Sequence, residues 1–134
     1  MAGERVLIVD DNEANVELAK FVLEDASFVV DSVANPADAM PRVASFLPDL
    51  ILMDIRLPGS DGLHLTRALK SDPATQGIVI VAFTAHAMKG DEARFLSEGC
   101  DAYIAKPIDV TSFARRVRSA LESHRPNDPG EVPH

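Results

Sequence analysis

Short, nearly unbroken apolar runs alternate along the chain with segments in which apolar residues recur every three or four positions. Runs of four to six residues without polar interruption are typical of parallel strands that are covered on both faces. The pattern predicts five strands, at residues 6–9, 28–33, 50–53, 78–83 and 102–105. The second is apolar only over its first three residues and then alternates.

The segments between these runs have helical spacing, with apolar side chains at i, i+3, i+4 and i+7. A helix is therefore expected after each strand. The residues predicted to face the core are Ala14, Leu18, Phe21 and Val22 in the first helix, Leu65, Ala68 and Leu69 in the third, Ala93 and Leu96 in the fourth, and Val110, Phe113, Ala114, Val117 and Leu121 in the fifth.

Capping residues and helix breakers indicate where several helices begin or end. Gly99 is expected just beyond the fourth helix, and Asp109 is the expected N-cap of the fifth. In the second helix, Asn35 and Pro36 suit the first turn, but Pro41 falls inside the helix. Because proline lacks a backbone N–H, this helix is expected to be kinked or short.

The order strand–helix, five times over, predicts the α/β class: a doubly wound, flavodoxin-like (βα)5 fold with a five-stranded parallel sheet in the order 2-1-3-4-5. A chain of 134 residues accommodates one domain of this kind. We expect residues 1–124 to form that domain. Residues 125–134 are rich in proline and polar residues, and they are expected to form a disordered C-terminal tail.

Charge and cysteine content narrow the functional classes. The formal net charge of −8 argues against nucleic acid and against anionic membrane surfaces as partners. Cys100 is the only cysteine, which excludes an internal disulfide and a cysteine-rich zinc site. The N-terminus lacks the apolar core of a signal peptide, and the apolar runs are too short to span a bilayer, so a cytoplasmic protein is expected.

Chemically useful residues follow four of the five predicted strands. In open parallel sheets, ligands bind beyond the carboxyl ends of the strands, where the strand order reverses. The residues at these ends are Asp10, Asp11, Asp54, Thr84, Ala85, Lys106 and Pro107. Clustered carboxylates repel one another unless a cation joins them, and Mg²⁺ prefers such oxygen ligands. A carboxylate can also form an aspartyl-phosphate, so the set suits phosphoryl transfer to an aspartate.

Each of these residues, taken alone, has an ordinary structural explanation. Asp10 and Asp11 suit a helix N-cap or a turn, Asp54 a loop, Thr84 a strand end, and Lys106 an exposed turn before a proline. The functional interpretation depends on their coincidence at neighbouring strand ends.

In combination, the motifs resemble the receiver domain of two-component response regulators. The matching stretches are residues 6–12, 52–62, 82–85 and 99–108, and the resemblance covers residues 5 to 123. Residues 84–93 further resemble single-domain regulators of the DivK type, with CheY-like organisation. The resemblance implies a phosphoacceptor that receives its phosphoryl group from the phosphohistidine of a histidine kinase or histidine phosphotransfer protein.

The resemblance also implies a role for individual residues. Asp54 would be phosphorylated, and Mg²⁺ would be bound by Asp11, Asp54 and the backbone carbonyl of Arg56, with Asp10 acting through metal-bound water. Thr84, Ala85, Lys106 and Tyr103 would bind the phosphoryl group and carry the conformational switch. The Lys106–Pro107 peptide bond would be cis. Tyr103 alone could equally be a half-buried packing residue.

Phosphorylation would change binding of a downstream protein target through the face formed by the fourth helix, fifth strand and fifth helix. Such a module is expected to be a monomer or weak dimer and not an enzyme, beyond promoting its own phosphorylation and slow dephosphorylation. Two alternatives remain open: a receiver excised from a hybrid histidine kinase, and an aspartyl phosphatase of the haloacid-dehalogenase type. The phosphatase would require a second acid two residues beyond its nucleophile, where this chain has Arg56.

Overall fold

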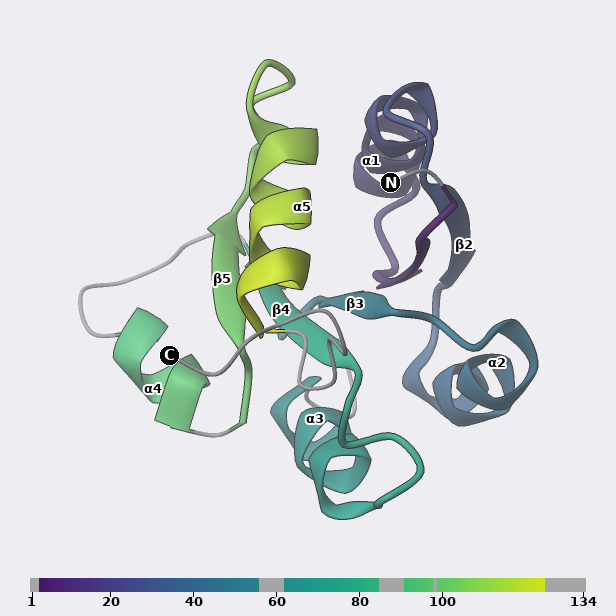
Figure 1. Cartoon of the computed structure of the whole chain (residues 1–134), viewed down its shortest axis with the longest axis vertical. Helices are drawn as coiled ribbons and strands as arrows, with labels where there is room; N and C mark the ends of the chain where they lie inside the picture. The colour runs from purple at the N-terminus through teal and green to yellow at the C-terminus, as the bar shows by residue number, and fades with distance from the viewer. Residues whose placement is uncertain (1–2, 56–61, 85–90, 98, 125–134) are drawn as a thin grey trace.

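The computed structural model describes residues 3–55, 62–84, 91–97 and 99–124. Five parallel strands form one sheet in the order β2-β1-β3-β4-β5, which confirms the predicted fold (Figure 1). The strands are β1 (Arg5–Val9), β2 (Val29–Val33), β3 (Leu50–Met53), β4 (Val79–Thr84) and β5 (Ala102–Ala105). The helices are α1 (Glu13–Asp25), α2 (Ala39–Phe46), α3 (Gly62–Ser71), α4 (Asp91–Ser97) and α5 (Phe113–His124), with a 3-10 turn, η1 (Pro36–Asp38), before α2.

The helices cover both faces of the sheet. Figure 1 shows α1 and α5 on one side and α2 and α3 on the other. Successive strand residues point to opposite faces, so the first strand supplies both cores. Val6 and Ile8 pack with α1 and α5, whereas Leu7 and Val9 pack with α2 and α3. All four are fully buried, which explains the unbroken apolar runs.

Capping residues fix where several helices begin and end. The Asn12 side chain accepts a hydrogen bond from Asn15 N and so caps α1. Asp109 caps the turn that leads into α5, since its carboxylate accepts from Thr111 N and its carbonyl from Phe113 N. Gly99, beyond the end of α4, has φ +116°, which glycine adopts without strain.

The prediction for the buried face of α1 was wrong for three of its four residues. Ala14 and Leu18 are exposed, and Phe21 has 70% of its surface accessible. Val22 does pack against the core, but the buried residues of the helix are Ala19 and Leu23. Two apolar stripes run along this helix, and spacing alone does not distinguish them. Ala19 is the small residue that lets the helix approach the sheet closely.

Smaller corrections apply to three other helices. Ala68, Ala93, Leu96 and Val110 are exposed. In α4 the buried residue is Phe95, which alone among the apolar residues described there has a large ring to insert into the core. In α5 the predicted stripe holds from Phe113 to Leu121, because Val110 precedes the first turn of the helix.

Proline shapes the second helical segment as its sequence indicated. The α-helix is only eight residues long, and Pro41 is its third residue. At that position a backbone N–H has no partner within the helix, so the proline is tolerated. The predicted C-terminal tail, residues 125–134, lies outside the described residues.

Candidate phosphoryl-acceptor site

Three aspartates meet at the carboxyl ends of the two central strands. Asp10 and Asp11 follow β1, and Asp54 follows β3, its neighbour in the sheet. One carboxylate oxygen of each lies within 4.8 Å of the others. Asp10 and Asp54 are only 1% and 7% exposed, whereas Asp11 is exposed to solvent. The cluster therefore has a buried base and an open side.

Sheet hydrogen bonds hold the backbone of the cluster in place. Asp54 N donates to Val9 O across 2.9 Å, and Asp10 N donates to Val33 O across 3.1 Å. The peptides that carry the two buried carboxylates thus continue the ladders of the strands before them. Asn12 N donates to Asp10 Oδ1 across 2.9 Å and orients that carboxylate. The site stands on rigid elements, which suits chemistry that depends on position.

Lys106, which follows β5, places its ammonium among the carboxylates. Its Nζ lies 2.7 Å from Asp10 Oδ2 and 3.5 Å from Asp54 Oδ2, and its side chain is 8% exposed. Lys106 N donates to Thr84 O across 2.9 Å, and the Lys106–Pro107 peptide bond is cis. One ammonium cannot neutralise three carboxylates, so the site retains about two net negative charges at neutral pH.

Asp10 Oδ2 is buried and accepts no hydrogen bond of acceptable angle within the described part of the chain. The ammonium of Lys106 lies 2.7 Å from this oxygen and forms an ion pair with it, although the angle is not that of a hydrogen bond. The ammonium therefore attracts Asp10 Oδ2 electrostatically, while the lone pairs of this oxygen remain available to a further donor or a cation. A buried carboxylate oxygen with spare capacity, beside two further carboxylates, is a suitable partner for a hydrated divalent cation.

The donor set fits Mg²⁺. The ligands are hard carboxylate oxygens, the local charge is negative, and the exposed side at Asp11 leaves room for water and phosphate oxygens. Among the residues that the structure describes, this cluster has no sulfur or histidine ligand, which argues against a zinc site. The backbone carbonyl of Arg56, predicted as another ligand, lies outside the described residues.

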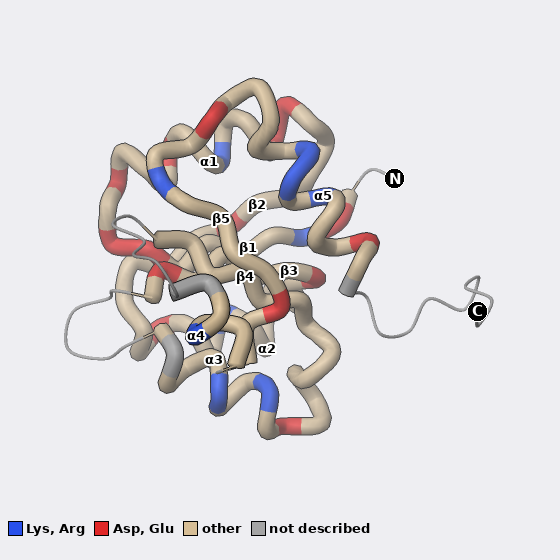
Figure 2. The backbone as a smooth tube through the Cα atoms, turned by 90° about the vertical axis from the view of Figure 1, so that its left-hand side faces the viewer, with Lys and Arg blue, Asp and Glu red and all other residues tan. Residues whose placement is uncertain are grey.

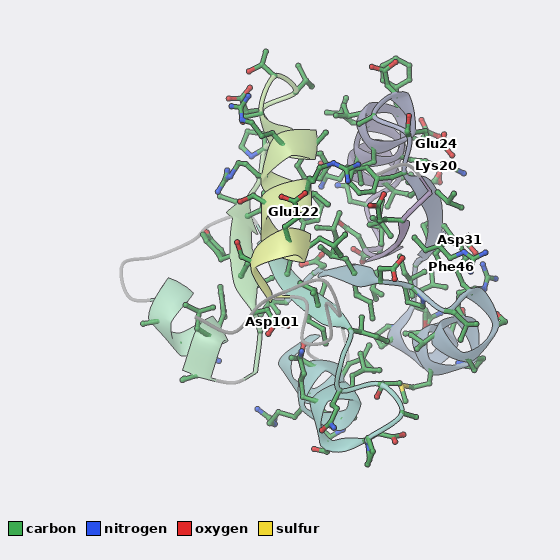
Figure 3. The ribbon with its side chains drawn as sticks, viewed as in Figure 1. Lys20, Glu24, Asp31, Phe46, Asp101 and Glu122 are labelled. Atoms are coloured by element: carbon green, nitrogen blue, oxygen red, sulfur yellow. The ribbon has the colours of Figure 1, made fainter. Side chains whose placement is uncertain are left out.

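A cleft leads to the cluster from the side of α1. It has a volume of about 270 Å³. Its lining consists of Asp10, Asp11, Glu13, Val16, Glu17, Lys20, Ser32, Val33 and Ala34. The side chains of Lys20 and Glu24 lie on the α1 side that faces β2 (Figure 3). This cleft reaches the cluster at Asp10 and Asp11, and Asp54 is not among the residues that line it.

The predicted switch residues occupy different surroundings. Thr84 ends β4, pairs in register with Ala105 and is 1% exposed. Tyr103, on β5, is half-buried, and its ring centroid lies 5.8 Å from that of Phe95 in α4. This ring contact places Tyr103 toward α4 and not among the three carboxylates. Ala85 lies outside the described residues.

Sequence inspection missed the close approach of Gly62 to the acceptor strand. A β-carbon at this position would lie 2.5 Å from the backbone oxygen of Asp54. In the sequence, Gly62 follows Asp61 and appears as an ordinary turn residue. Only the distance between two segments eight residues apart exposes its role.

Carboxylates at the switch point of a parallel sheet, with a lysine at the end of the edge strand β5, place this chain among the α/β domains that bind ligands beyond the carboxyl ends of their strands. The sequence matches the response regulator receiver domain family over residues 6–118. The chain belongs to this family of two-component signalling proteins. It is thus a signalling protein and not an enzyme of the usual kind, which sets aside the dehalogenase-type phosphatase.

Known proteins share both sequence and fold with this chain. The polar-differentiation response regulator DivK of Brucella anthropi is 43% identical over 116 residues, which cover 87% of this chain and 94% of the relative. A putative response regulator from Chloroflexus aurantiacus superimposes with a TM-score of 0.83 at 29% identity, covering 90% and 98% of the two chains. A sensor protein from Polaromonas sp. has a TM-score of 0.81 at 30% identity, with the same coverage. Among the described residues, no helix is long and apolar enough to cross a membrane.

Proposed function

We propose that this chain is a phosphoacceptor switch in which Asp54 receives a phosphoryl group from a phosphohistidine of a kinase or phosphotransfer protein. The observation that carries the proposal is the position of Asp54 beside Asp10, Asp11 and Lys106 at the central strand ends. Asp10 lies nearer to Lys106, at 2.7 Å, but it is only 1% exposed and its Oδ1 accepts from Asn12 N. Asp54 lies 3.5 Å from the lysine and is 7% exposed, so it is held next to a positive charge and is the more accessible of the two.

The transfer is an in-line substitution at phosphorus. A carboxylate oxygen of Asp54 attacks the phosphorus of the phosphohistidine, an O–P bond forms, and the N–P bond breaks. The imidazole nitrogen takes up a proton from water as it leaves, and the product is an aspartyl-phosphate. Lys106 then lies where its ammonium can pair with phosphoryl oxygens, a charge-assisted contact that Coulomb attraction favours.

Asp11 and Asp54, with Asp10 through water, are the described residues that would hold Mg²⁺. When bound, the cation supplies positive charge that offsets repulsion between the incoming phosphoryl group and the carboxylates. The protein's own contribution is to orient these oxygens through the hydrogen bonds Asp54 N to Val9 O and Asn12 N to Asp10 Oδ1.

The proposed output is a change in the face made by α4, β5 and α5. Thr84 lies beside Lys106 in the sheet, since Thr84 O accepts from Lys106 N. A phosphoryl group that draws the Thr84 hydroxyl toward Asp54 would alter the end of β4 next to this face. Tyr103 contacts Phe95 of α4 and is the described aromatic residue on β5 that could repack in response.

The donor is proposed to dock over the start of α1. Ala14, Leu18 and Phe21 form an exposed apolar stripe along α1, the helix whose residues Glu13 and Glu17 line the cleft at Asp11. With a phosphohistidine protein that labels the wild-type chain, Phe21→Ala should slow labelling several-fold and leave labelling by phosphoramidate unchanged. Leu47→Ala, at an exposed leucine after α2 on the opposite face of the sheet, is the control. Equal rates for Phe21→Ala and wild type would reject this surface.

The phosphoacceptor assignment is tested by incubating the protein with phosphoramidate and Mg²⁺ and following its intact mass. Wild type should gain one phosphoryl group, and Asp54→Asn should gain none at a comparable rate. Asp49→Asn is a matched control, because Asp49 immediately precedes the same strand and its amide variant can still accept from Arg5 N. Rapid labelling of Asp54→Asn would overturn the proposal.

A further inference from the structure

Gly62, in the first turn of α3, lies closer to the backbone of Asp54 than a residue with a side chain could. A β-carbon on Gly62 would lie 2.5 Å from Asp54 O, 3.0 Å from the Cα of Ile55 and 3.0 Å from the Cγ of Met53. Two of these three atoms belong to the backbone, so they cannot move aside as the tip of a flexible side chain can. The absence of a side chain is therefore what permits the contact.

We infer that Gly62 is a positioning residue, whose missing side chain lets α3 seat against Asp54 and so sets the place of the acceptor carboxylate. The inference rests on the proposed function, since it concerns the same aspartate. Gly62 N donates across 3.3 Å to the backbone oxygen of Ile55, the residue that follows Asp54. The acceptor peptide is thus confined between Val9 O, which accepts from Asp54 N, and the start of α3.

A buried threonine fixes that first turn. Thr66 is fully buried, and its hydroxyl donates to Gly62 O across 2.7 Å. This bond is local to the helix, and it holds the carbonyl of the residue that abuts the acceptor strand. Thr66 therefore supports the seating of Gly62 without touching the carboxylates.

The opposite end of α3 is also anchored to the sheet. Lys70 Nζ lies 2.6 Å from Asp101 Oδ2, and the same oxygen accepts from Ile80 N across 2.9 Å. Asp101 precedes β5 and points toward α3 in Figure 3. A helix held at both ends cannot easily swing away to relieve a clash at its start. An added methyl group at residue 62 would instead push on the Asp54 peptide.

The size of the displacement follows from the contact distances. Moving a Gly62 β-carbon from 2.5 Å to 3.0 Å from Asp54 O, the limit below which real contacts are essentially absent, needs a shift of 0.5 Å. Catalytic constellations lose function over displacements of this order, and 1 Å can cost about 100-fold in rate. We expect Gly62→Ala to reduce phosphorylation at saturating phosphoramidate roughly 10-fold. Local helix propensity alone predicts no harm, because alanine favours helix over glycine.

Gly99→Ala is the matched control. Gly99 also borders α3, but a β-carbon there would meet only ordinary contacts, 3.5 Å from Thr66 and 3.6 Å from Lys70. Its cost comes from φ +116°, a backbone conformation that alanine rarely adopts. Gly99→Ala should therefore lower the melting temperature and leave the labelling rate unchanged. Gly62→Ala should instead slow labelling while the protein remains folded.

The experiment measures labelling rate against phosphoramidate concentration, with melting temperature and circular dichroism as checks on folding. A second readout is Mn²⁺ binding by electron paramagnetic resonance, without any phosphodonor. Displacement of Asp54 should weaken Mn²⁺ binding by Gly62→Ala about 10-fold. Wild-type rates and Mn²⁺ affinity in Gly62→Ala would overturn the inference, while an unlabelled wild type would instead reject the proposed function.

If Gly62→Ala does not fold, two variants of Thr66 provide the test. Thr66→Val keeps the shape but removes the hydroxyl, and Thr66→Ser keeps the hydroxyl. Labelling by Thr66→Val should be at least about 3-fold slower than by Thr66→Ser, in line with loss of one supporting hydrogen bond. Equal rates in these two variants would overturn the positioning role of this turn.

Discussion

Replacing Lys106 by methionine tests the electrostatics of the site. The substitution keeps the length of the side chain and removes its charge. With an effective dielectric constant of about 20, the lysine's attraction to Asp10 across 2.7 Å is about 6 kcal/mol, and that to Asp54 across 3.5 Å is about 5 kcal/mol. Desolvation of the ammonium offsets several kcal/mol of this. The expected loss of unfolding free energy is about 3–5 kcal/mol, as for other broken buried ion pairs.

A double-mutant cycle with Asp10→Asn separates this effect from simple loss of packing. In the wild-type background, Asp10→Asn removes a partner of Lys106 but also relieves the repulsion from Asp11 and Asp54, so its net effect on stability should be small. In the Lys106→Met background, the same change removes an uncompensated carboxylate that is 1% exposed, and it should raise stability. Asp10→Asn should therefore be more favourable in the Lys106→Met background than in wild type, with an interaction energy of at least about 2 kcal/mol.

The assay is urea unfolding of all four proteins at neutral pH in EDTA, followed by circular dichroism. Domains of this size have unfolding free energies of about 5–15 kcal/mol, so each variant should retain a measurable transition. Added Mg²⁺ should stabilise Lys106→Met more than wild type, because the cation replaces missing positive charge. Additive effects of the two substitutions, within about 0.5 kcal/mol, would refute the reasoning.

Three further outcomes follow from the charges. Arg118→Met should lower stability by about 2 kcal/mol in thermal or urea unfolding, because Arg118 Nη1 lies 3.2 Å from the buried Glu4 and its guanidinium carbon lies 4.5 Å from the centroid of Phe28. A wild-type transition midpoint would contradict this. Asp11→Ala or EDTA should slow phosphoramidate labelling at least about 10-fold, and unchanged rates would exclude the metal role. The chain should not bind a defined DNA duplex in a shift assay, since its net charge is −8 and the basic residues of α5 stand beside acidic neighbours (Figure 2); tight, salt-sensitive binding would contradict this.

The sheet could be predicted from sequence because its strands are buried on both faces. Residues 50–53 are all apolar, and the corresponding strand is fully buried along its length. The observed start of a strand differs from the predicted one by one residue where the apolar pattern and the hydrogen bonding disagree. Phe28 is apolar and buried, but its N–H donates to Leu23 O at the end of α1, so β2 begins at Val29.

Helix orientation was harder to predict, as α1 shows. Its buried residues Ala19 and Leu23 and its exposed residues Leu18 and Phe21 are all apolar. Hydrophobic periodicity identifies a stripe, but not which of two stripes meets the sheet. Packing of the core does not explain the exposed stripe, and its position on α1 agrees with the proposed docking surface.

The members of the candidate site followed from topology, but their pairings did not. Strand order places Asp10 and Asp54 at the ends of the neighbouring strands β1 and β3, and Lys106 at the same side of the sheet at the end of β5, and this could be predicted from the sequence. That Lys106 lies nearer Asp10 than Asp54 depends on side-chain geometry. The contact between Arg118 and Glu4 joins residues that are 114 positions apart, and no local sequence pattern predicts it.

The central claim is that the phosphoryl group is carried by Asp54. The most direct measurement is borohydride reduction of the labelled protein followed by peptide mass mapping, since reduction converts an aspartyl-phosphate into homoserine. We predict that homoserine appears at position 54 only after incubation with phosphoramidate and Mg²⁺, and not at the neighbouring acids Asp10 and Asp11. Homoserine at another aspartate, or labelled protein with position 54 unmodified, would contradict the account.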